Sequence, residues 1–138
     1  MIHAETPISI PFHDIDIMDI AWHGHYLKYF ELARTDIMKM MSLDWTDLRE
    51  MGIALPVVDV QVKYRRPLLY GKSYTVRSKI EEIDYPELCL SYQVFDDEFG
   101  KLHCSGSTRQ IYMEIDSQTT FFQVPKEIYE RLEWHANH

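Results

Sequence analysis

The segment from residue 12 to residue 30 gathers the side chains of this chain that are best suited to chemistry. Three carboxylates, at Asp14, Asp16 and Asp19, and three histidines lie between positions 13 and 25. A helix that began directly after them would present unpaired backbone N–H groups and a partial positive charge. Such donors stabilise a developing oxyanion, and a carboxylate facing the same point can attack a carbonyl or activate water. The segment therefore has the groups that acyl transfer requires.

Two other interpretations of this segment stay open. The first is an acidic loop that caps a helix and carries its histidines on the surface. The second is a metal site, because the three aspartates together with His23 and His25 could supply ligands. Their spacing matches no metal signature, and an EF-hand loop beginning at Asp14 fails because Met18 and Asp19 fall where a ligand and a glycine are needed. No bound metal is therefore predicted.

A long helix is predicted directly after the segment, over residues 26–41. Apolar side chains recur there at helical spacing, at Tyr26, Phe30, Ala33, Ile37 and Met41. A shorter helix is predicted within residues 42–52, with Asp44 as its N-cap and Gly52 as its terminator. The long helix is the element that would position the carboxylates and histidines before it.

Alternating apolar and polar residues predict an antiparallel sheet. Residues 7–12 form a brief strand pattern, and longer patterns follow at about 58–65, 74–81, 88–94 and 101–115. Short polar turns join the last three patterns, and short connections favour antiparallel neighbours. In the last pattern Ile111 lies on the opposite parity from Cys104, so Gly106 between them predicts a bulge that changes the inward face.

The whole chain is expected to be one α+β domain over residues 1–138. A length of 138 residues is typical of one domain, and a sheet with one apolar face needs a helix to cover that face. Residues 126–134 form an amphipathic pattern that predicts a closing helix. Residues 135–138 are expected to be a frayed tail.

Composition and charge exclude several classes of function. The chain has 14 Lys and Arg against 22 Asp and Glu, a net charge of −8, so binding of nucleic acid through bulk charge is not expected. No apolar run is long enough to span a membrane, and the N-terminus shows no signal-peptide pattern. The two cysteines do not make a disulfide framework, which favours a cytoplasmic protein with reduced thiols.

The motifs in and after this segment resemble those of the hotdog-fold acyl-CoA thioesterases of the 4-hydroxybenzoyl-CoA thioesterase and YbgC-like family. The chain reads FHDID at 12–16, IAWHGHY at 20–26, FELAR at 30–34 and YRRPLLYG at 64–71. The resemblance covers nearly the whole chain, and the family shares the order of elements predicted above. It implies a hotdog fold, in which a curved five-stranded antiparallel sheet wraps a long central helix.

The resemblance also implies an activity, the hydrolysis of acyl-CoA thioesters to a free acid and coenzyme A, with no cofactor. Asp16 matches the family's catalytic carboxylate, which attacks the thioester carbonyl or activates a water. The backbone N–H of His23 matches the group that polarises the thioester oxygen, and His25 and Tyr26 match positions that shape the acyl pocket. A homodimer or homotetramer is implied, with the acyl site between protomers.

A local excess of basic side chains suits such an anionic substrate. Residues 63–79 contain six cations and no Asp or Glu. Because coenzyme A carries phosphates, which the planar fork of arginine binds well, Arg65 and Arg66 are the preferred contacts. The solvated face of two strands is the alternative interpretation of this stretch.

One departure from the family pattern leaves a second function open. Met18 and Asp19 stand where the family usually has small residues, so they are expected to fill space near the acyl group beside Asp16. A protein that binds acyl-CoA or acyl-carrier-protein thioesters without efficient turnover is therefore an alternative. A metal-dependent hydrolase that uses the Asp/His cluster is a weaker one.

Overall fold

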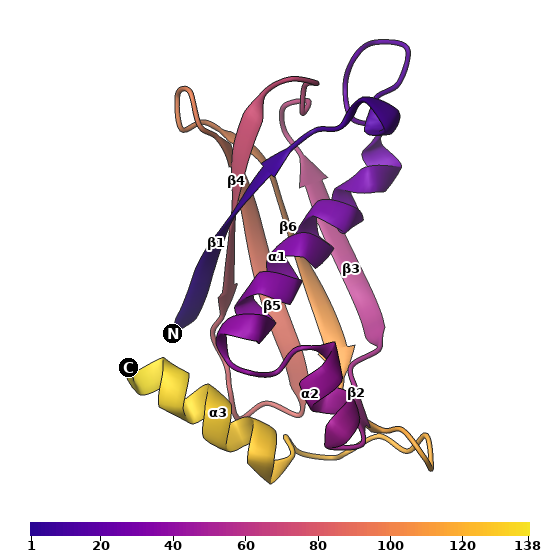
Figure 1. Ribbon diagram of the computed structural model, residues 1–138, viewed down its shortest axis with the longest axis vertical. Coiled ribbons are helices and arrows are strands. Elements are labelled where there is room, and N and C mark those ends of the chain that lie inside the picture. Colours follow the sequence, from indigo (N-terminus) through magenta and orange to yellow (C-terminus); the bar gives the residue numbers. More distant parts are fainter.

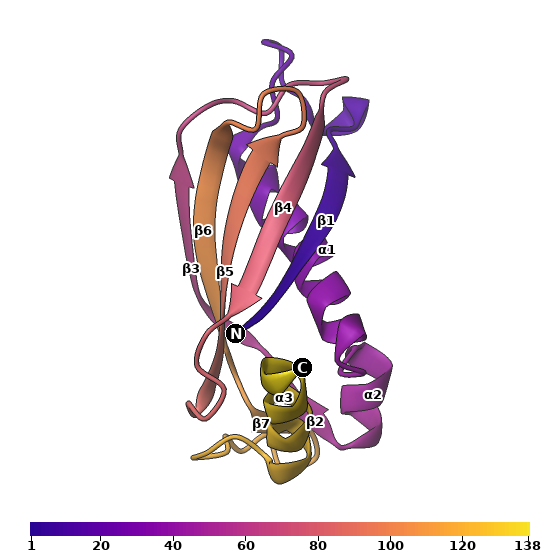
Figure 2. The ribbon, with the colours of Figure 1, turned by 90° about the vertical axis from the view of Figure 1, so that its left-hand side faces the viewer.

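The computed structural model describes residues 1–138, and its largest feature is a five-stranded antiparallel sheet (Figure 1). The strands lie in the order β1-β4-β5-β6-β3. Their bounds are Ile2–Ser9 for β1, Val57–Tyr64 for β3, Ser73–Ile80 for β4, Glu87–Asp96 for β5 and Leu102–Ile111 for β6. Helix α1 (Tyr26–Met40) lies against one face of the sheet (Figure 2), so the predicted α+β class is confirmed.

Helix α1 buries the apolar stripe that its sequence predicts. Phe30, Ala33 and Ile37 are fully buried, and the helix contacts the sheet mainly through β1 and β4. The ring of Phe30 stacks on Tyr92 of β5, with the ring centroids 4.6 Å apart. Burial of large apolar side chains of this kind contributes about 1.5–3 kcal/mol each. The helix is therefore held over one half of the sheet.

Strand β3 lies at the other edge of the sheet and is only partly covered. Val60 and Tyr64 face the same side as α1, because they pair with the buried residues Thr108 and Cys104 of β6. Their exposed fractions are nevertheless 40% and 51%. The alternation in this strand predicts a buried face, but α1 lies too far toward β1 and β4 to cover it.

Gly106 has a different role from the bulge that its position in the sequence predicts. It pairs in register with both neighbouring strands. A Cβ atom at this position would lie 2.5 Å from both the Phe30 ring and the carbonyl oxygen of Gln61, so glycine permits the close approach of α1. The inward face does not change after Gly106, because Thr108 and Tyr112 both stay buried. The predicted switch of face is therefore wrong.

The first strand begins earlier than its sequence pattern indicates. Strand β1 covers Ile2–Ser9 rather than residues 7–12, and Phe12 lies outside it in the short 3-10 helix η1 (Phe12–Asp14), where it is 71% exposed. A polar residue at an inward position hides the pattern: Thr6 is buried, and its hydroxyl donates to Asp36 of α1 at 2.8 Å. Alternation alone does not reveal such a strand.

Smaller elements close the lower end of the sheet. Helix α2 (Trp45–Glu50) begins at its predicted cap, where Asp44 accepts the N–H of Asp47 at 3.1 Å and Asp47 accepts the N–H of Asp44. Strand β2 (Ile53–Ala54) pairs with β7 (Met113–Glu114). Helix α3 (Lys126–Asn137) lies at the same end (Figure 1), and because it continues to Asn137, residues 135–137 are helical rather than frayed.

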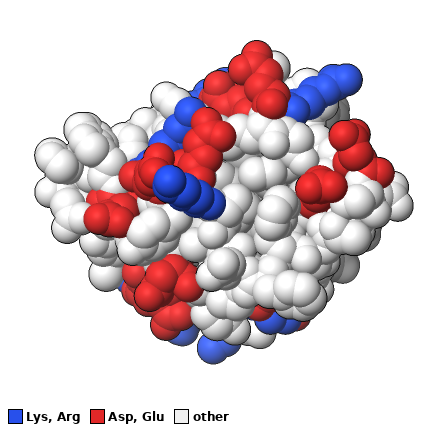
Figure 3. All heavy atoms as spheres, turned by 90° about the horizontal axis from the view of Figure 1, so that it is seen from below, with Lys and Arg blue, Asp and Glu red and all other residues white.

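The surface agrees with the acidic composition. Seen from the end that carries α3, it shows several separate groups of Asp and Glu with few Lys and Arg between them (Figure 3). This end therefore offers no extended basic face of the kind that binds a phosphate backbone. No helix of the chain is long and apolar enough to cross a membrane.

We expect Gly106→Ala to destabilise the fold, because the added methyl group would overlap Phe30 and the Gln61 carbonyl oxygen. Overpacking of this kind costs about 1–3 kcal/mol of unfolding free energy, which urea unfolding followed by circular dichroism measures. Ser107→Ala, one residue further along β6, is the matched control and should change stability by less than about 0.5 kcal/mol. Equal stability of the two variants would contradict the role assigned to Gly106.

Candidate active site

A buried carboxylate attaches the loop of residues 12–22 to α1. Asp14 is 2% exposed and accepts hydrogen bonds from the Lys28 ammonium and, at 2.9 Å, from the Tyr29 hydroxyl. Its carbonyl oxygen accepts the N–H of Trp22 at 3.0 Å. The Asp14 side chain therefore attaches the loop to the first turn of the helix, and its carbonyl oxygen joins the two ends of the loop.

Asp16 lies at the base of a tight turn in this loop. Its N–H donates to the carbonyl oxygen of Ile20 at 2.9 Å, and one carboxylate oxygen accepts the N–H of Met18 at 2.8 Å. The other carboxylate oxygen, Oδ2, has no hydrogen-bond partner within the chain. The turn thus orients the carboxylate by one oxygen and leaves the second oxygen free.

The chain enters α1 through a single 3-10 turn, η2 (His23–His25). The N–H of His23 is the first of that turn, so it has no acceptor within the turn, and no loop carbonyl or side chain accepts it. The Tyr64 hydroxyl of β3 donates to the His23 carbonyl oxygen at 2.8 Å. Gly24 leaves room for the Trp22 ring, which would lie 2.1 Å from a Cβ atom there. The unpaired N–H of His23 therefore lies in a turn that is supported by Tyr64 and by the packing of Trp22 against Gly24.

A cavity of about 300 Å³ brings most of the predicted site together. Asp16, His23, Tyr26, Arg65 and Arg66 all line it, five of the six site residues predicted from the sequence. The other lining residues are Ile20, Ala21, Tyr64 and Pro67. The residues that carry a free carboxylate oxygen, an unpaired backbone N–H and two guanidinium groups thus line one cavity. These are the groups that attack, stabilise and bind an anionic acyl compound.

His25 is the predicted site residue that does not line this cavity. Its ring packs edge-on against Trp22, with the ring centroids 5.4 Å apart. Met18 and Asp19 do not line the cavity either, because both are exposed at the tip of the turn. The expected crowding by these two residues is therefore absent from the cavity in this chain.

The loop of residues 65–69 is attached to the start of α1. The Tyr26 hydroxyl accepts the N–H of Leu68 at 3.3 Å, and the Leu68 carbonyl oxygen accepts the N–H of Ala21 at 2.8 Å. Burial raises the pKa of Tyr26 to about 12, so this hydroxyl stays protonated at neutral pH. The backbone of the loop that carries the two arginines is therefore attached to the helix start and to the segment before it.

Ion pairing divides the six cations of residues 63–79 into two groups. Lys72 pairs with Glu98 at 3.7 Å, Arg77 with Glu5 at 3.1 Å and Lys79 with Glu81 at 3.1 Å.

The other three cations, Lys63, Arg65 and Arg66, form no ion pair with the chain's own carboxylates. Arg65 and Arg66 are exposed and lie at the cavity. Their charge is therefore available to an anionic ligand.

The Asp/His cluster does not converge on one point. No group of three or more His, Cys, Asp or Glu side chains is arranged to hold a metal ion. Asp14, which the metal interpretation needs as a ligand, is instead bound to Lys28 and Tyr29. The geometry of these residues therefore favours a carboxylate and a helix start over a metal centre.

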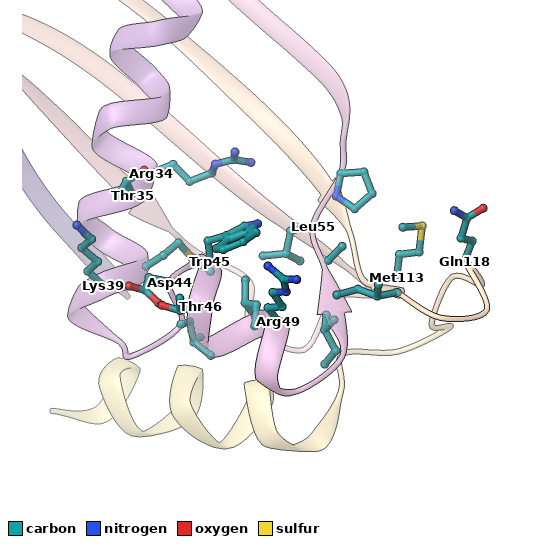
Figure 4. A pocket seen from close by; sticks show the side chains of 17 residues that line it. Arg34, Thr35, Lys39, Asp44, Trp45, Thr46, Arg49, Leu55, Met113 and Gln118 are labelled. Carbon is teal, nitrogen blue, oxygen red and sulfur yellow. The ribbon is translucent and has the colours of Figure 1, made fainter.

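A second, larger cavity of about 970 Å³ lies at the opposite end of α1, between that helix, α2, β2 and β7. Nine of its 17 lining residues are hydrophobic. Trp45 and Leu55 extend into it, and the Arg49 guanidinium lies 5.0 Å from the centre of the Trp45 ring (Figure 4). No site residue predicted from the sequence lines this cavity.

Tyr64 is the site residue that reasoning from the sequence missed. It belongs to the YRRPLLYG motif, but the alternation of its strand indicates a core position. Half of its surface is exposed instead, and its hydroxyl supports the His23 turn. The only signal in the sequence is an aromatic residue directly before the two arginines.

These elements agree with a known family. The model of the thioesterase-like superfamily matches residues 10–132, which include every residue of the small cavity. The chain belongs to this superfamily. The family assignment predicted from the motifs at residues 12–34 is therefore confirmed, and it identifies the chain as a thioesterase at the level of the family.

Individual relatives agree with the assignment of this thioesterase-like chain. YneP of Bacillus subtilis is 27% identical over 114 residues, which cover 83% of this chain and 82% of YneP. The long-chain acyl-CoA thioesterase FadM of Escherichia coli is 22% identical over 130 residues, covering 94% and 96%. The DHNA-CoA thioesterase of Staphylococcus aureus superposes with a TM-score of 0.85 at 26% identity, covering 99% and 95%. The hotdog fold is therefore confirmed.

We expect this thioesterase-like chain to lose stability in acid through Asp14. Burial alone raises the pKa of Asp14, but hydrogen bonds from Lys28 and Tyr29 and the Lys28 charge outweigh it and lower the pKa below 3.8. A lowered pKa stabilises the fold at pH values above the unfolded pKa, and that contribution is lost as the pH falls through the folded value. Urea unfolding at a series of pH values measures the loss, which should begin below about pH 4.

Asp14→Asn should remove this pH dependence and lower the free energy of unfolding at neutral pH by about 1–3 kcal/mol. Asp19→Asn is the matched control, because Asp19 is an exposed carboxylate of the same loop and asparagine tolerates its left-handed backbone, φ 61°. If both variants lose the same stability, Asp14 does not anchor the loop.

Proposed function

We propose that this chain hydrolyses acyl-CoA thioesters to a free acid and coenzyme A. The observation that carries the proposal is the small cavity, which is lined by Asp16, with one carboxylate oxygen free of partners, and by His23, with an unpaired backbone N–H. Hydrolysis of a thioester needs an attacking group and a donor for the oxyanion. The superfamily and the named activities of FadM and the DHNA-CoA thioesterase support the same reaction.

The reaction follows from these groups in one of two ways. Asp16 takes a proton from water, and the resulting hydroxide adds to the thioester carbonyl carbon; or the Asp16 oxygen itself adds and forms an anhydride that water then cleaves. In both, the carbonyl oxygen becomes an oxyanion that accepts the N–H of His23. The C–S bond breaks as the oxyanion collapses, and the coenzyme A thiolate takes up a proton.

The charge around the cavity suits the rest of the substrate. Arg65 and Arg66 form no ion pair within the chain, and both line the cavity that holds Asp16. Coenzyme A carries phosphates, which guanidinium groups bind with charge-assisted hydrogen bonds. These two arginines therefore hold the nucleotide part of the substrate while the thioester reaches Asp16.

The unpaired edge of β3 supports a homodimer. This strand pairs only with β6, and its apolar side chains at Val60 and Tyr64 are about half exposed on the face that α1 leaves uncovered. Exposed edge strands with apolar side chains are prone to pair with a second chain. A second copy of this chain, related by a two-fold axis, pairs β3 with β3 in antiparallel orientation. A homotetramer would add a second interface to this one.

Such a dimer also accounts for the larger cavity. Antiparallel pairing brings Tyr64 of one protomer next to the Val57 end of the partner's strand. Leu55 and Pro56, which line the larger cavity, directly precede Val57 in the chain. The acyl chain of a thioester held at Asp16 therefore enters the largely apolar cavity of the partner, and the acyl site lies between protomers.

We expect Asp16→Asn to lower thiol release from saturating acyl-CoA by about 10²–10⁴-fold, because an amide neither attacks the carbonyl nor accepts a proton from water. Thiol release is followed with a colorimetric thiol reagent. Asp19→Asn, on the same turn but outside the cavity, should retain the parent rate.

Three other outcomes of this experiment have distinct meanings. An unchanged rate in Asp16→Asn contradicts the mechanism. Tight binding of acyl-CoA by the wild type with no release of thiol indicates the alternative of a binding protein. Loss of activity in EDTA indicates a metal-dependent hydrolase, whereas the proposed mechanism predicts activity that survives the chelator. Acyl-carrier-protein thioesters in the same assay identify the preferred carrier.

Disruption of the β3 edge should separate the protomers and impair the reaction. Val60→Lys adds a charge at the centre of the proposed interface, so size-exclusion chromatography with light scattering should detect monomer, and thiol release should fall at least about tenfold. His3→Lys, at an exposed position of the opposite edge strand β1, is the control and should leave both properties unchanged. A fully active monomer would contradict the shared acyl site.

A further inference from the structure

His103 is the second residue of β6 and lies against the loop of residues 65–69, which carries Arg65 and Arg66. Its side chain is 12% exposed, and both ring nitrogens face acceptors. Nε2 lies 2.9 Å from a carboxylate oxygen of Asp96, and Nδ1 lies 3.1 Å from the carbonyl oxygen of Pro67. A carboxylate and a carbonyl oxygen can only accept, so both bonds form together when both nitrogens carry protons. The ring therefore has an acceptor beside each of its two nitrogens.

The main chain of His103 holds the same loop. Its carbonyl oxygen accepts the N–H of Arg65 at 3.0 Å and the N–H of Arg66 at 2.9 Å. With the ring contact to Pro67, one residue binds three successive residues of the loop that lines the small cavity. The backbone from which both guanidinium groups extend is thus held by His103.

The partners of His103 are themselves fixed. Asp96 accepts the N–H groups of Phe99 and Lys101 in the turn between β5 and β6. These bonds, the Phe99 N–H foremost, and the contact with His103 lower the pKa of Asp96, so it remains a carboxylate at neutral pH.

Tyr74 of β4 packs edge-on against the His103 ring, with centroids 5.1 Å apart, and its hydroxyl accepts the N–H of Leu69 at 2.8 Å. The loop is therefore anchored at its far end as well. His103 and Asp96 are thus each held by contacts with neighbouring elements.

We propose that the His103–Asp96 pair is a positioning device for the substrate's phosphates, which orients Arg65 and Arg66 toward coenzyme A without touching the reacting thioester. This inference rests on the proposed function. If His103 only positions the two arginines, its loss impairs the binding of substrates that carry phosphates and of no others. A general structural role would impair the reaction of every substrate. The same acyl group on N-acetylcysteamine, which has the thioester but no phosphate, distinguishes the two roles.

The experiment compares kcat and KM of the wild type, His103→Gln and Asp96→Asn on the two thioesters. For acyl-CoA, KM should rise about tenfold in His103→Gln, the effect of losing one ordered contact, with kcat within about twofold. For the N-acetylcysteamine thioester, both constants should stay at their wild-type values. Asp96→Asn keeps an acceptor oxygen without its charge, so its KM for acyl-CoA should lie between those of the wild type and His103→Gln. His3→Gln, an exposed histidine of β1 outside the cavity, is the control.

Failure of this inference and failure of the proposed function give different results. An unchanged KM for acyl-CoA in both variants, or an equal rise for both thioesters, overturns the positioning role while the wild type still cleaves acyl-CoA. A wild type that cleaves neither thioester overturns the proposed function. Calorimetric binding of coenzyme A itself then decides the role of His103: weaker binding in His103→Gln supports it and equal binding overturns it.

Discussion

The candidate site depends on the ion pair that the buried carboxylate of Asp14 makes with the half-exposed Lys28. A charge taken out of water costs several kcal/mol unless a partner compensates for it, so the loop of residues 12–22 cannot leave α1 without exposing or abandoning that carboxylate. Asp16 follows Asp14 by two residues, and His23 follows Trp22, whose N–H binds the Asp14 carbonyl oxygen. One residue therefore holds in place the segment that carries Asp16 and leads into the His23 turn.

The position of α1 on the sheet explains why the apolar face of β3, at one edge of the sheet, is left uncovered. Phe30 enters the space above Gly106, which draws the helix close to the middle of the sheet, and the helix then extends toward β1 and β4. The apolar side chains of β3 remain uncovered as a result. Packing that stabilises one half of the molecule thus leaves an exposed apolar surface on the other half, where Tyr64 also lines the cavity that holds Asp16.

The chain is acidic as a whole, but a few of its cations remain free of ion pairs. Three of the six clustered cations are neutralised by glutamates, and those that remain unpaired include both arginines of the loop at residues 65–69. Backbone N–H groups of this loop donate to Tyr26, Tyr74 and His103, which belong to three different elements. Because the guanidinium fork binds phosphate with a defined geometry, a fixed backbone makes these two charges more selective than mobile ones.

Local patterns in the sequence determined much of this protein. The spacing of Tyr26, Phe30 and Ile37 predicted α1 within one residue of its end, and Asp44 predicted the cap of α2, because both signals act within a few turns of chain. The motif at residues 12–34 indicated the family and the hotdog fold. The resemblance placed Asp16 and His23 in one proposed site, and the local excess of cations added Arg65 and Arg66 to it.

Only the tertiary structure decided the contacts that join distant segments. The inward Thr6 of β1 is satisfied by Asp36, and the purpose of Gly106 appears only when Phe30 lies above it. Likewise, Tyr64 supports His23 across 41 residues, and His103 holds Pro67 across 36. Periodicity reports which face of an element is apolar, but it carries no information about which side chain of another element fills a given space. Those pairings depend on how α1 and the strands pack, and they turn a set of suitable residues into one cavity.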